Sequence, residues 1–276
     1  PLEAVVSAPD AESIYQVPSI LDEQGLTDYL LRKMKLDLSK SNMKKWDSFV
    51  KNLMTPKGEV EIAVVGKYTE LKDSYASHIE AFHHASAEAG VRVKLRWLEG
   101  EDLEKPGHEK LLKGVDGVLI PGGFGDRGVE GKINAIRYAR EKKIPLLGVC
   151  LGFQLSVAEF CRNVLGWKGA NSSEFNPRTK YPVIDILPEQ EGVTDMGGTM
   201  RLGAHDVNLA KGCKTSALYG GKLKISERHR HRYEVNPNYI DKIEARGMKF
   251  TGRSKDGVRM EVAELEGHPF FVATQF

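Results

Sequence analysis

A single cysteine stands in a tight, glycine-bounded turn near the middle of the chain. Cys150 lies in the segment Gly-Val-Cys-Leu-Gly at 148–152, directly after the apolar run 144–149. This pattern is typical of a nucleophile elbow, in which a strand turns sharply into a helix and presents its central side chain. The glycines fit because a Cβ on either side would clash in so tight a turn. The turn predicts a nucleophile, with a buried structural cysteine as the alternative.

The helix that this turn begins would also influence the chemistry of the thiol. A helix N-terminus carries partial positive charge, which favours an anion beside it. We therefore expect the pKa of the Cys150 thiol to be lowered, which favours the reactive thiolate.

A second glycine-rich loop follows another apolar run. Residues 115–120 predict a buried strand that leads into Pro-Gly-Gly-Phe-Gly at 121–125. In a parallel sheet both loops fall at the same carboxyl edge, where ligands bind. Glycines there expose backbone N–H groups that can stabilise an oxyanion, although one such loop alone is equally a plain turn. The two loops together predict a nucleophile beside an oxyanion site.

Strand patterns alternate with helix patterns from residue 60 onward, which predicts an α/β fold with a mostly parallel central sheet flanked by helices. Strands are expected at 61–66, 91–98, 115–120 and 144–149, and helices at 73–89 and 128–142. The second half has more strands, expected at 183–187, 200–209, 228–235, 248–252, 260–265 and 270–275, with one helix starting near 237.

Residues 1–57 differ in sequence pattern from the rest of the chain. They contain helix-like patches at 20–31 and 43–53 on either side of a polar break. We expect a linker or the tail of a preceding domain there, and a main domain at 58–276.

The 276 residues carry a formal net charge of +2, so neither nucleic acid nor a membrane is expected as a partner. No run approaches the ~20 apolar residues of a membrane span. Three cysteines make a disulfide framework improbable and favour a cytoplasmic location.

Longer motifs in the sequence resemble those of a known family. The pairing of Pro-Gly-Gly-Phe-Gly at 121–125 with Gly-Val-Cys-Leu-Gly-Phe-Gln at 148–154 resembles the class I glutamine amidotransferases. The stretches 171–175, 197–203 and 227–236 narrow the resemblance to the CTP synthase family, whose synthetase domain ends in a segment similar to 1–57. Phe153 departs from the Met that is common in that family. The resemblance implies a flavodoxin-like core and an ammonia-producing domain that hydrolyses L-glutamine.

The resemblance also implies roles at the matching positions. Cys150 would attack glutamine and form a thioester, which splits one difficult hydrolysis into two easier steps. The backbone N–H groups of Gly123 and Leu151 would stabilise the oxyanion. Glu174 would face the α-ammonium group and Arg232 the α-carboxylate of the substrate. The substrate-binding set is Gly123, Phe124, Leu151, Gln154, Glu174 and Arg232.

The same resemblance implies the wider reaction. Ammonia would pass to a synthetase domain of the same protein, which uses ATP and Mg²⁺ to convert UTP to CTP in an oligomer, a tetramer in the full-length family. No cofactor or metal is expected in this chain. GTP would act as an allosteric effector, with ordinary surface ion pairing as the alternative for its predicted contacts, namely Arg127, Gly128, Glu130, Thr199 and Arg201.

The basic run 228–232 allows several other interpretations. As a strand it would place Arg228, Arg230 and Arg232 on one face, and the two histidines between them on the other. A solvated basic strand and nucleic-acid binding are alternatives. A metal site at His229 and His231 is a further alternative, disfavoured because no third ligand stands at a familiar spacing.

A cysteine nucleophile needs a general base. The family carries it in a His-Pro-Glu motif after a strand like the one that ends at Phe276, so we expect a truncated, poorly active chain. His268 is expected to be structural, because it precedes a strand about 25 Å long that separates it from the turn. The alternatives to the CTP synthase reading are the amidotransferase half of another synthetase, such as a GMP synthase, and a catalytically silent regulatory or assembly module.

Overall fold

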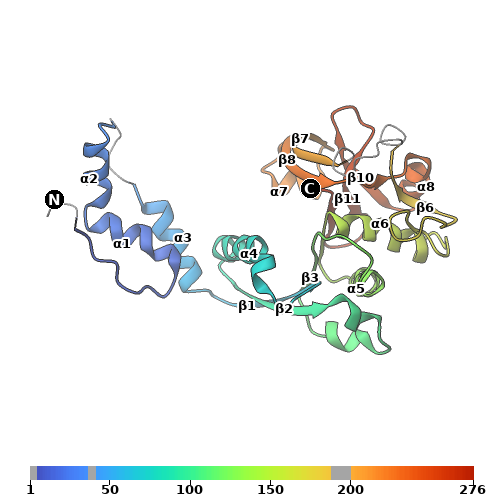
Figure 1. Ribbon diagram of the computed structural model, residues 1–276, viewed down its shortest axis with the longest axis horizontal. Helices are drawn as coiled ribbons and strands as arrows, with labels where there is room; N and C mark the ends of the chain where they lie inside the picture. Colours follow the sequence, from blue (N-terminus) through green and yellow to red (C-terminus); the bar gives the residue numbers. More distant parts are fainter. Residues whose placement is uncertain (1–4, 37–41, 188–199) are drawn as a thin grey trace. The chain divides into compact units, whose positions relative to one another are not determined.

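The computed structural model describes residues 5–36, 42–187 and 200–276 (Figure 1). Its contacts divide the chain into two compact units. One comprises Pro1–Val60 with Asp73–Lys94, and the other Glu61–Lys72 with Leu95–Phe276. The division of the chain at residue 57 stays a prediction. Among the described residues, no helix is long and apolar enough to cross a membrane.

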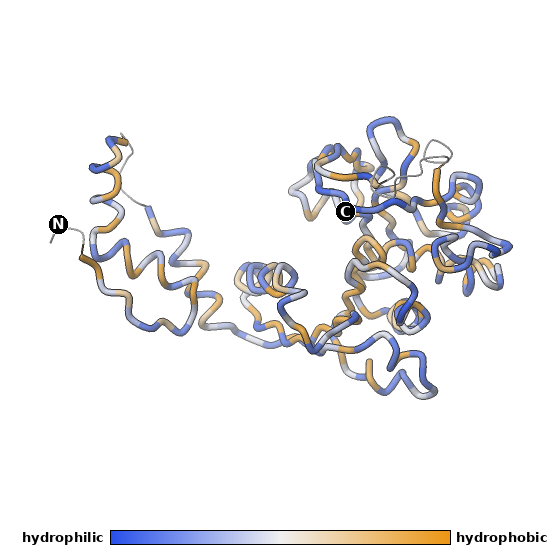
Figure 2. Tube along the Cα trace, viewed as in Figure 1, coloured by the Kyte–Doolittle hydropathy of each residue, from blue (hydrophilic) through white to orange (hydrophobic). Residues whose placement is uncertain are grey.

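The N-terminal unit is built from short helices, as the patches at 20–31 and 43–53 predicted. These are α1 (Val17–Glu23), α2 (Leu26–Lys33), α3 (Lys44–Met54) and α4 (Ala76–Ala89). Hydrophobic and hydrophilic stretches alternate along the first three (Figure 2). An aromatic cluster joins the turn at Tyr15 to α3 and α4: the ring of Tyr15 lies 5.9 Å from Trp46 and 5.6 Å from His84. Gly90, with φ 67°, ends α4 in the left-handed conformation that glycine adopts without strain.

A nine-stranded sheet, in the order β2-β1-β3-β4-β12-β11-β10-β7-β8, is the framework of the C-terminal half. Its parallel part contains β1 (Glu59–Gly66), β3 (Gly117–Ile120), β4 (Leu146–Val149) and β12 (Phe271–Thr274). With β2 (Arg92–Glu99) these strands have the order 2-1-3-4-5 of a flavodoxin-like core. The predicted α/β class is confirmed.

The other strands of this sheet pair antiparallel. They are β11 (Met260–Leu265), β10 (Met248–Ser254), β7 (Arg201–Leu209) and β8 (Lys224–His231). A small second sheet contains β5 (Asn171–Ser172), β6 (Pro182–Asp185) and β9 (Glu234–Val235). The predicted strand at 228–235 is therefore two strands in different sheets, which changes the direction of the chain just before Arg232.

Helices cover the parallel strands. They are α5 (Val129–Lys142) and α6 (Leu151–Asn163), with α7 (Lys214–Leu218) and α8 (Ile240–Glu244) farther along the chain. Val129, Ile133 and Ile136 form one buried stripe of α5 at helical spacing. Glu159, fully buried in α6, accepts hydrogen bonds from Arg140 of α5, from Nη2 at 2.8 Å and from Nε at 2.9 and 3.1 Å. This bidentate pair ties together the two helices that follow the predicted functional loops.

Candidate active site

Cys150 has a backbone conformation that few residues with a side chain adopt. It lies between β4 and α6 with φ 52° and ψ −100°. Its N–H donates a 2.7 Å hydrogen bond to the carbonyl oxygen of Thr274 in β12. Strain of this kind persists only where the surroundings impose it, and it concentrates at functional sites. The predicted elbow conformation is confirmed.

The flanking glycines are required by close backbone contacts. A Cβ on Gly152 would lie 2.2 Å from the carbonyl oxygen of Ile120, at the end of β3. A Cβ on Gly148 would lie 2.8 Å from the carbonyl oxygen of Gly152. The first turn of α6 therefore packs directly on the neighbouring strand, which leaves the Cys150 side chain at the edge of the sheet.

The two glycine-rich loops meet beside the thiol. A Cβ on Gly122 would lie 3.4 Å from the Cβ of Cys150. A cavity of about 190 Å³ opens there. All seven residues predicted for catalysis, oxyanion stabilisation and substrate binding line it: Gly123, Phe124, Cys150, Leu151, Gln154, Glu174 and Arg232. Their roles stay predictions, but their juxtaposition is a property of the fold.

Sequence reasoning missed three lining residues, namely Met200, His231 and Tyr233. His231 and Tyr233 flank Arg232 in the sequence. The change of direction after β8 brings these two residues and Arg232 to one cavity. The carbonyl oxygen of Tyr233 accepts a 3.1 Å hydrogen bond from the side-chain amide of Gln154, which is 4% exposed. This bond fixes Gln154 at the wall of the cavity.

Residues of opposite charge, Glu174 and Arg232, line this cavity. Burial raises the pKa of Glu174, while the backbone N–H of Gly125 and the charges of Arg232 and Lys67 lower it. Glu174 and Arg232 are thus electrostatically coupled, and both line the cavity. Such a pair suits a zwitterion that carries an ammonium and a carboxylate group on neighbouring atoms.

The expectation of a lowered thiol pKa is wrong for Cys150. Burial raises the pKa of Cys150 to about 11, and the carboxylates of Glu174 and Glu234 add to the rise. Hydrogen bonds from the Leu151 N–H and the Gln275 side chain oppose it without cancelling it. The helix N-terminus is present as expected, but loss of water around the sulfur outweighs it.

This raised pKa predicts a steep pH dependence of thiol reactivity. Only the thiolate reacts with iodoacetamide, so alkylation of Cys150 should accelerate about tenfold per pH unit between about pH 7 and pH 9. Mass spectrometry of the peptide that contains Cys150 would measure the rate. A plateau that begins below about pH 8 would contradict the effect of burial.

Alternation along β8 holds only as far as the strand does. Arg228 and Arg230 are exposed, and His229 and His231, which alternate with them, are buried. The strand ends at His231, so the prediction that Arg232 shares a face with the other two arginines is wrong. Arg232 lines the cavity instead, where the family resemblance placed it.

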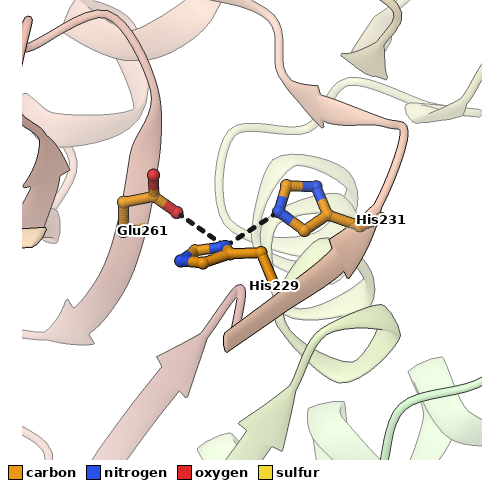
Figure 3. Close-up of side chains that lie close together, drawn as sticks. All are labelled: His229, His231 and Glu261. Carbon is orange, nitrogen blue, oxygen red and sulfur yellow. Dashed lines mark hydrogen bonds and ion pairs between the residues drawn. The ribbon is translucent and has the colours of Figure 1, made fainter. Parts of the chain in front are cut away.

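The two buried histidines belong to a polar cluster with Glu261 of β11 (Figure 3). His229 Nδ1 lies 3.0 Å from His231 Nε2 and 3.6 Å from a Glu261 oxygen. Sequence spacing did not reveal Glu261 as a third possible ligand. Burial lowers the pKa of His229 to about 3 and of His231 to about 4, so both rings are neutral near pH 7.

An arginine decides how this cluster is best described. Arg201 donates a hydrogen bond to the second oxygen of Glu261, and its charge also lowers the pKa of both histidines. A divalent ion would have to sit beside this guanidinium, which repels it. His231 Nδ1 lies 3.3 Å from the carbonyl oxygen of Tyr233. The cluster thus favours a hydrogen-bonded support beneath the cavity wall over a metal centre.

The charged residues among the predicted GTP contacts are engaged in ion pairs. Arg127 pairs with Glu101 at 2.8 Å, and Glu130 pairs with Arg162 at 2.7 Å. Gly128, with φ 71°, caps α5. Arg201 is largely buried on Glu261. Thr199 lies outside the described residues, and binding of GTP at these positions stays a prediction.

His268 occupies the position expected of a structural residue. It is 3% exposed, its Nε2 lies 3.3 Å from the carbonyl oxygen of Ala139, and its ring contacts Phe271. It precedes β12, whereas Cys150 bonds to Thr274 at the other end of that strand.

Comparison with known proteins places this cavity in a family. A family model described as glutamine amidotransferase class-I matches residues 70–276. The glutaminase domain of Trypanosoma brucei CTPS, a structure with bound acivicin, is 39% identical with a TM-score of 0.74, over 79% of this chain and 85% of that one. The chain belongs to the class-I glutamine amidotransferases, and within them to the glutaminase domains of CTP synthases.

CTP synthases from two organisms match this amidotransferase over the whole of its own sequence. The enzymes of Pyrococcus furiosus and Archaeoglobus fulgidus are each 53% identical to it. The chain spans about half the length of these two relatives, 51% in each case. The amidotransferase half of a different synthetase is therefore not favoured.

Proposed function

We propose that this amidotransferase hydrolyses L-glutamine at Cys150 and supplies the ammonia to a synthetase domain that converts UTP to CTP. The observation that carries the first step is a strained cysteine in the same small cavity as the coupled pair Glu174 and Arg232. The cavity, about 190 Å³, is small compared with ordinary ligand pockets and suits a ligand of amino-acid size.

The roles that the family resemblance implies give the order of events. Glu174 binds the α-ammonium group and Arg232 the α-carboxylate, which directs the side-chain amide of glutamine toward Cys150. The sulfur attacks the amide carbon, and the C–N bond breaks with release of ammonia. The N–H groups of Leu151 and Gly123 stabilise the oxyanion, and one such donor is typically worth about 3–4 kcal/mol. Water then hydrolyses the thioester to glutamate.

The proton of the thiol needs an acceptor, and the family resemblance assigns this role to the histidine of a His-Pro-Glu motif. The Cys150 N–H donates a hydrogen bond to the carbonyl oxygen of Thr274, so β12 ends beside the turn that carries the sulfur. The His-Pro-Glu motif of the family stands at that point of its sequence. Such a base would lower the pKa of a thiol that burial otherwise raises to about 11.

The remaining features belong to the whole enzyme. ATP and Mg²⁺ would act in the synthetase domain, GTP would stimulate glutamine hydrolysis, and the protein would be a cytoplasmic homo-oligomer. These proposals rest on similarity to CTP synthases over the whole of this chain and half of each relative.

Covalent labelling tests the proposal independently of turnover. Acivicin is bound in the Trypanosoma brucei structure, and it should add to Cys150 of the present protein. Mass spectrometry should place the adduct on Cys150 alone, with Cys161 and Cys213 unmodified because both are buried. Excess L-glutamine should slow the labelling. At about pH 9, where more of the thiol is ionised, a cysteine that stays unlabelled, or labelling that glutamine does not slow, would contradict a glutamine site.

A further inference from the structure

Lys67 contacts the loop 121–125, although it lies outside the predicted catalytic motifs. It directly follows β1, which runs parallel to β3 with Val64 opposite Leu119. The ends of the two strands therefore lie at the same edge of the sheet. Lys67 Nζ donates hydrogen bonds to the carbonyl oxygens of Phe124, at 2.7 Å, and Gly125, at 3.2 Å.

One peptide group connects this lysine to Glu174. The carbonyl of Phe124 and the N–H of Gly125 belong to the same trans peptide, so they point in opposite directions. Lys67 binds the carbonyl on one side, and the N–H on the other side lowers the pKa of Glu174, which lines the same cavity. A cation that polarises a peptide in this way strengthens the hydrogen bond at its far end.

The conformation of the loop depends on the same contact. Gly125 has φ 76°, which a residue with a side chain rarely adopts, and a Cβ there would lie 3.6 Å from Lys67 Nζ. The lysine thus holds the loop in the orientation that turns the Gly125 N–H toward the cavity. Burial lowers the pKa of Lys67 and the charge of Arg127 lowers it further, while the carboxylates of Asp126, Glu174 and Glu101 oppose the change.

We propose that Lys67 is a positioning residue for the substrate: through the peptide between Phe124 and Gly125, it orients Glu174 toward the α-ammonium group of glutamine. The inference rests on the proposed function and adds to it a residue outside the recognised motifs. Lys67 touches neither the substrate nor the reacting atoms. It acts on binding rather than on the attack by Cys150.

The test measures glutamine binding to the full chain in a Cys150→Ser background, which prevents turnover. Calorimetry should show that Lys67→Met weakens L-glutamine binding by about tenfold to a hundredfold, the range of one charge-assisted hydrogen bond. Lys67→Arg keeps the cation and should restore most of the affinity. Lys142→Met, at an exposed lysine of α5, is the matched control and should change nothing.

A second ligand separates positioning from general damage. Glutamine without its α-amino group, 4-carbamoylbutanoate, makes no use of Glu174, so Lys67→Met should leave its affinity unchanged. For L-glutamine, Glu174→Gln with Lys67→Met should be no worse than Glu174→Gln alone, because both changes remove one interaction. Equal weakening of both ligands, or additive losses in the double variant, would overturn the proposal.

Two further outcomes separate this inference from the proposed function. If the Cys150→Ser parent binds no glutamine, the proposed function fails and the role of Lys67 fails with it. If the parent binds glutamine and Lys67→Met binds it equally well, only the role of Lys67 is overturned. Circular dichroism checks the fold, and Lys67→Gln replaces Lys67→Met, with the same expected loss, if the latter does not fold.

Discussion

Replacement of Gly152 by alanine is expected to destabilise the protein by about 3 kcal/mol, the upper part of the range for overpacking. In most helices the same change is neutral or stabilising, because alanine has the higher helix propensity. Here the new Cβ would lie 2.2 Å from the Ile120 carbonyl oxygen, a backbone atom of a central strand that cannot rotate away. Urea unfolding, followed by circular dichroism, would measure the loss.

Gly123→Ala is the matched control for this prediction. A Cβ on Gly123 would meet its nearest neighbour, a methyl carbon of Leu151, at 3.6 Å, which is ordinary van der Waals contact. Its stability should therefore change by less than about 1 kcal/mol. Equal stability of the two variants would mean that α6 does not pack on β3 as closely as the structure has it.

The catalytic turn could be predicted from the sequence because its requirements are local. Gly148, Cys150 and Gly152 stand within five residues, and the strain and the close contacts arise within that segment and the strand beside it. The parallel strands were predictable for a similar reason, since each is a short apolar run. Their carboxyl ends then had to meet at one edge.

Features that depend on contacts distant in sequence were not predictable in this way. Glu261 joins His229 and His231 only because β11 and β8 belong to one sheet, and Arg201 joins them from β7. The raised pKa of Cys150 could not be predicted, because the sequence reveals the helix N-terminus but not how much water the fold removes from the sulfur. Lys67 carries no motif, and its role emerges only from its reach to Phe124.

Arg232 is the residue whose removal should weaken glutamine binding most. Its guanidinium can form two parallel hydrogen bonds with the α-carboxylate of the substrate, so Arg232→Ala should weaken binding by about a hundredfold to a thousandfold. Arg232→Lys keeps a positive charge without the planar fork and should retain part of the affinity. Calorimetry with L-glutamine in the Cys150→Ser background would measure each variant, with the exposed Arg228→Ala of the same run as control.

The pH dependence of the Arg232→Ala variant follows from its neighbour. Burial raises the pKa of Glu174, and the charge of Arg232 lowers it, so loss of Arg232 should raise this pKa further. Glu174 binds the ammonium group only as a carboxylate, so binding present at higher pH is lost as the pH falls through its pKa. In Arg232→Ala that loss should begin at a higher pH than in the parent. If the two proteins instead lose glutamine over the same pH range, then Arg232 and Glu174 are not coupled as the cavity has them, and recognition of the zwitterion by this pair would have to be abandoned.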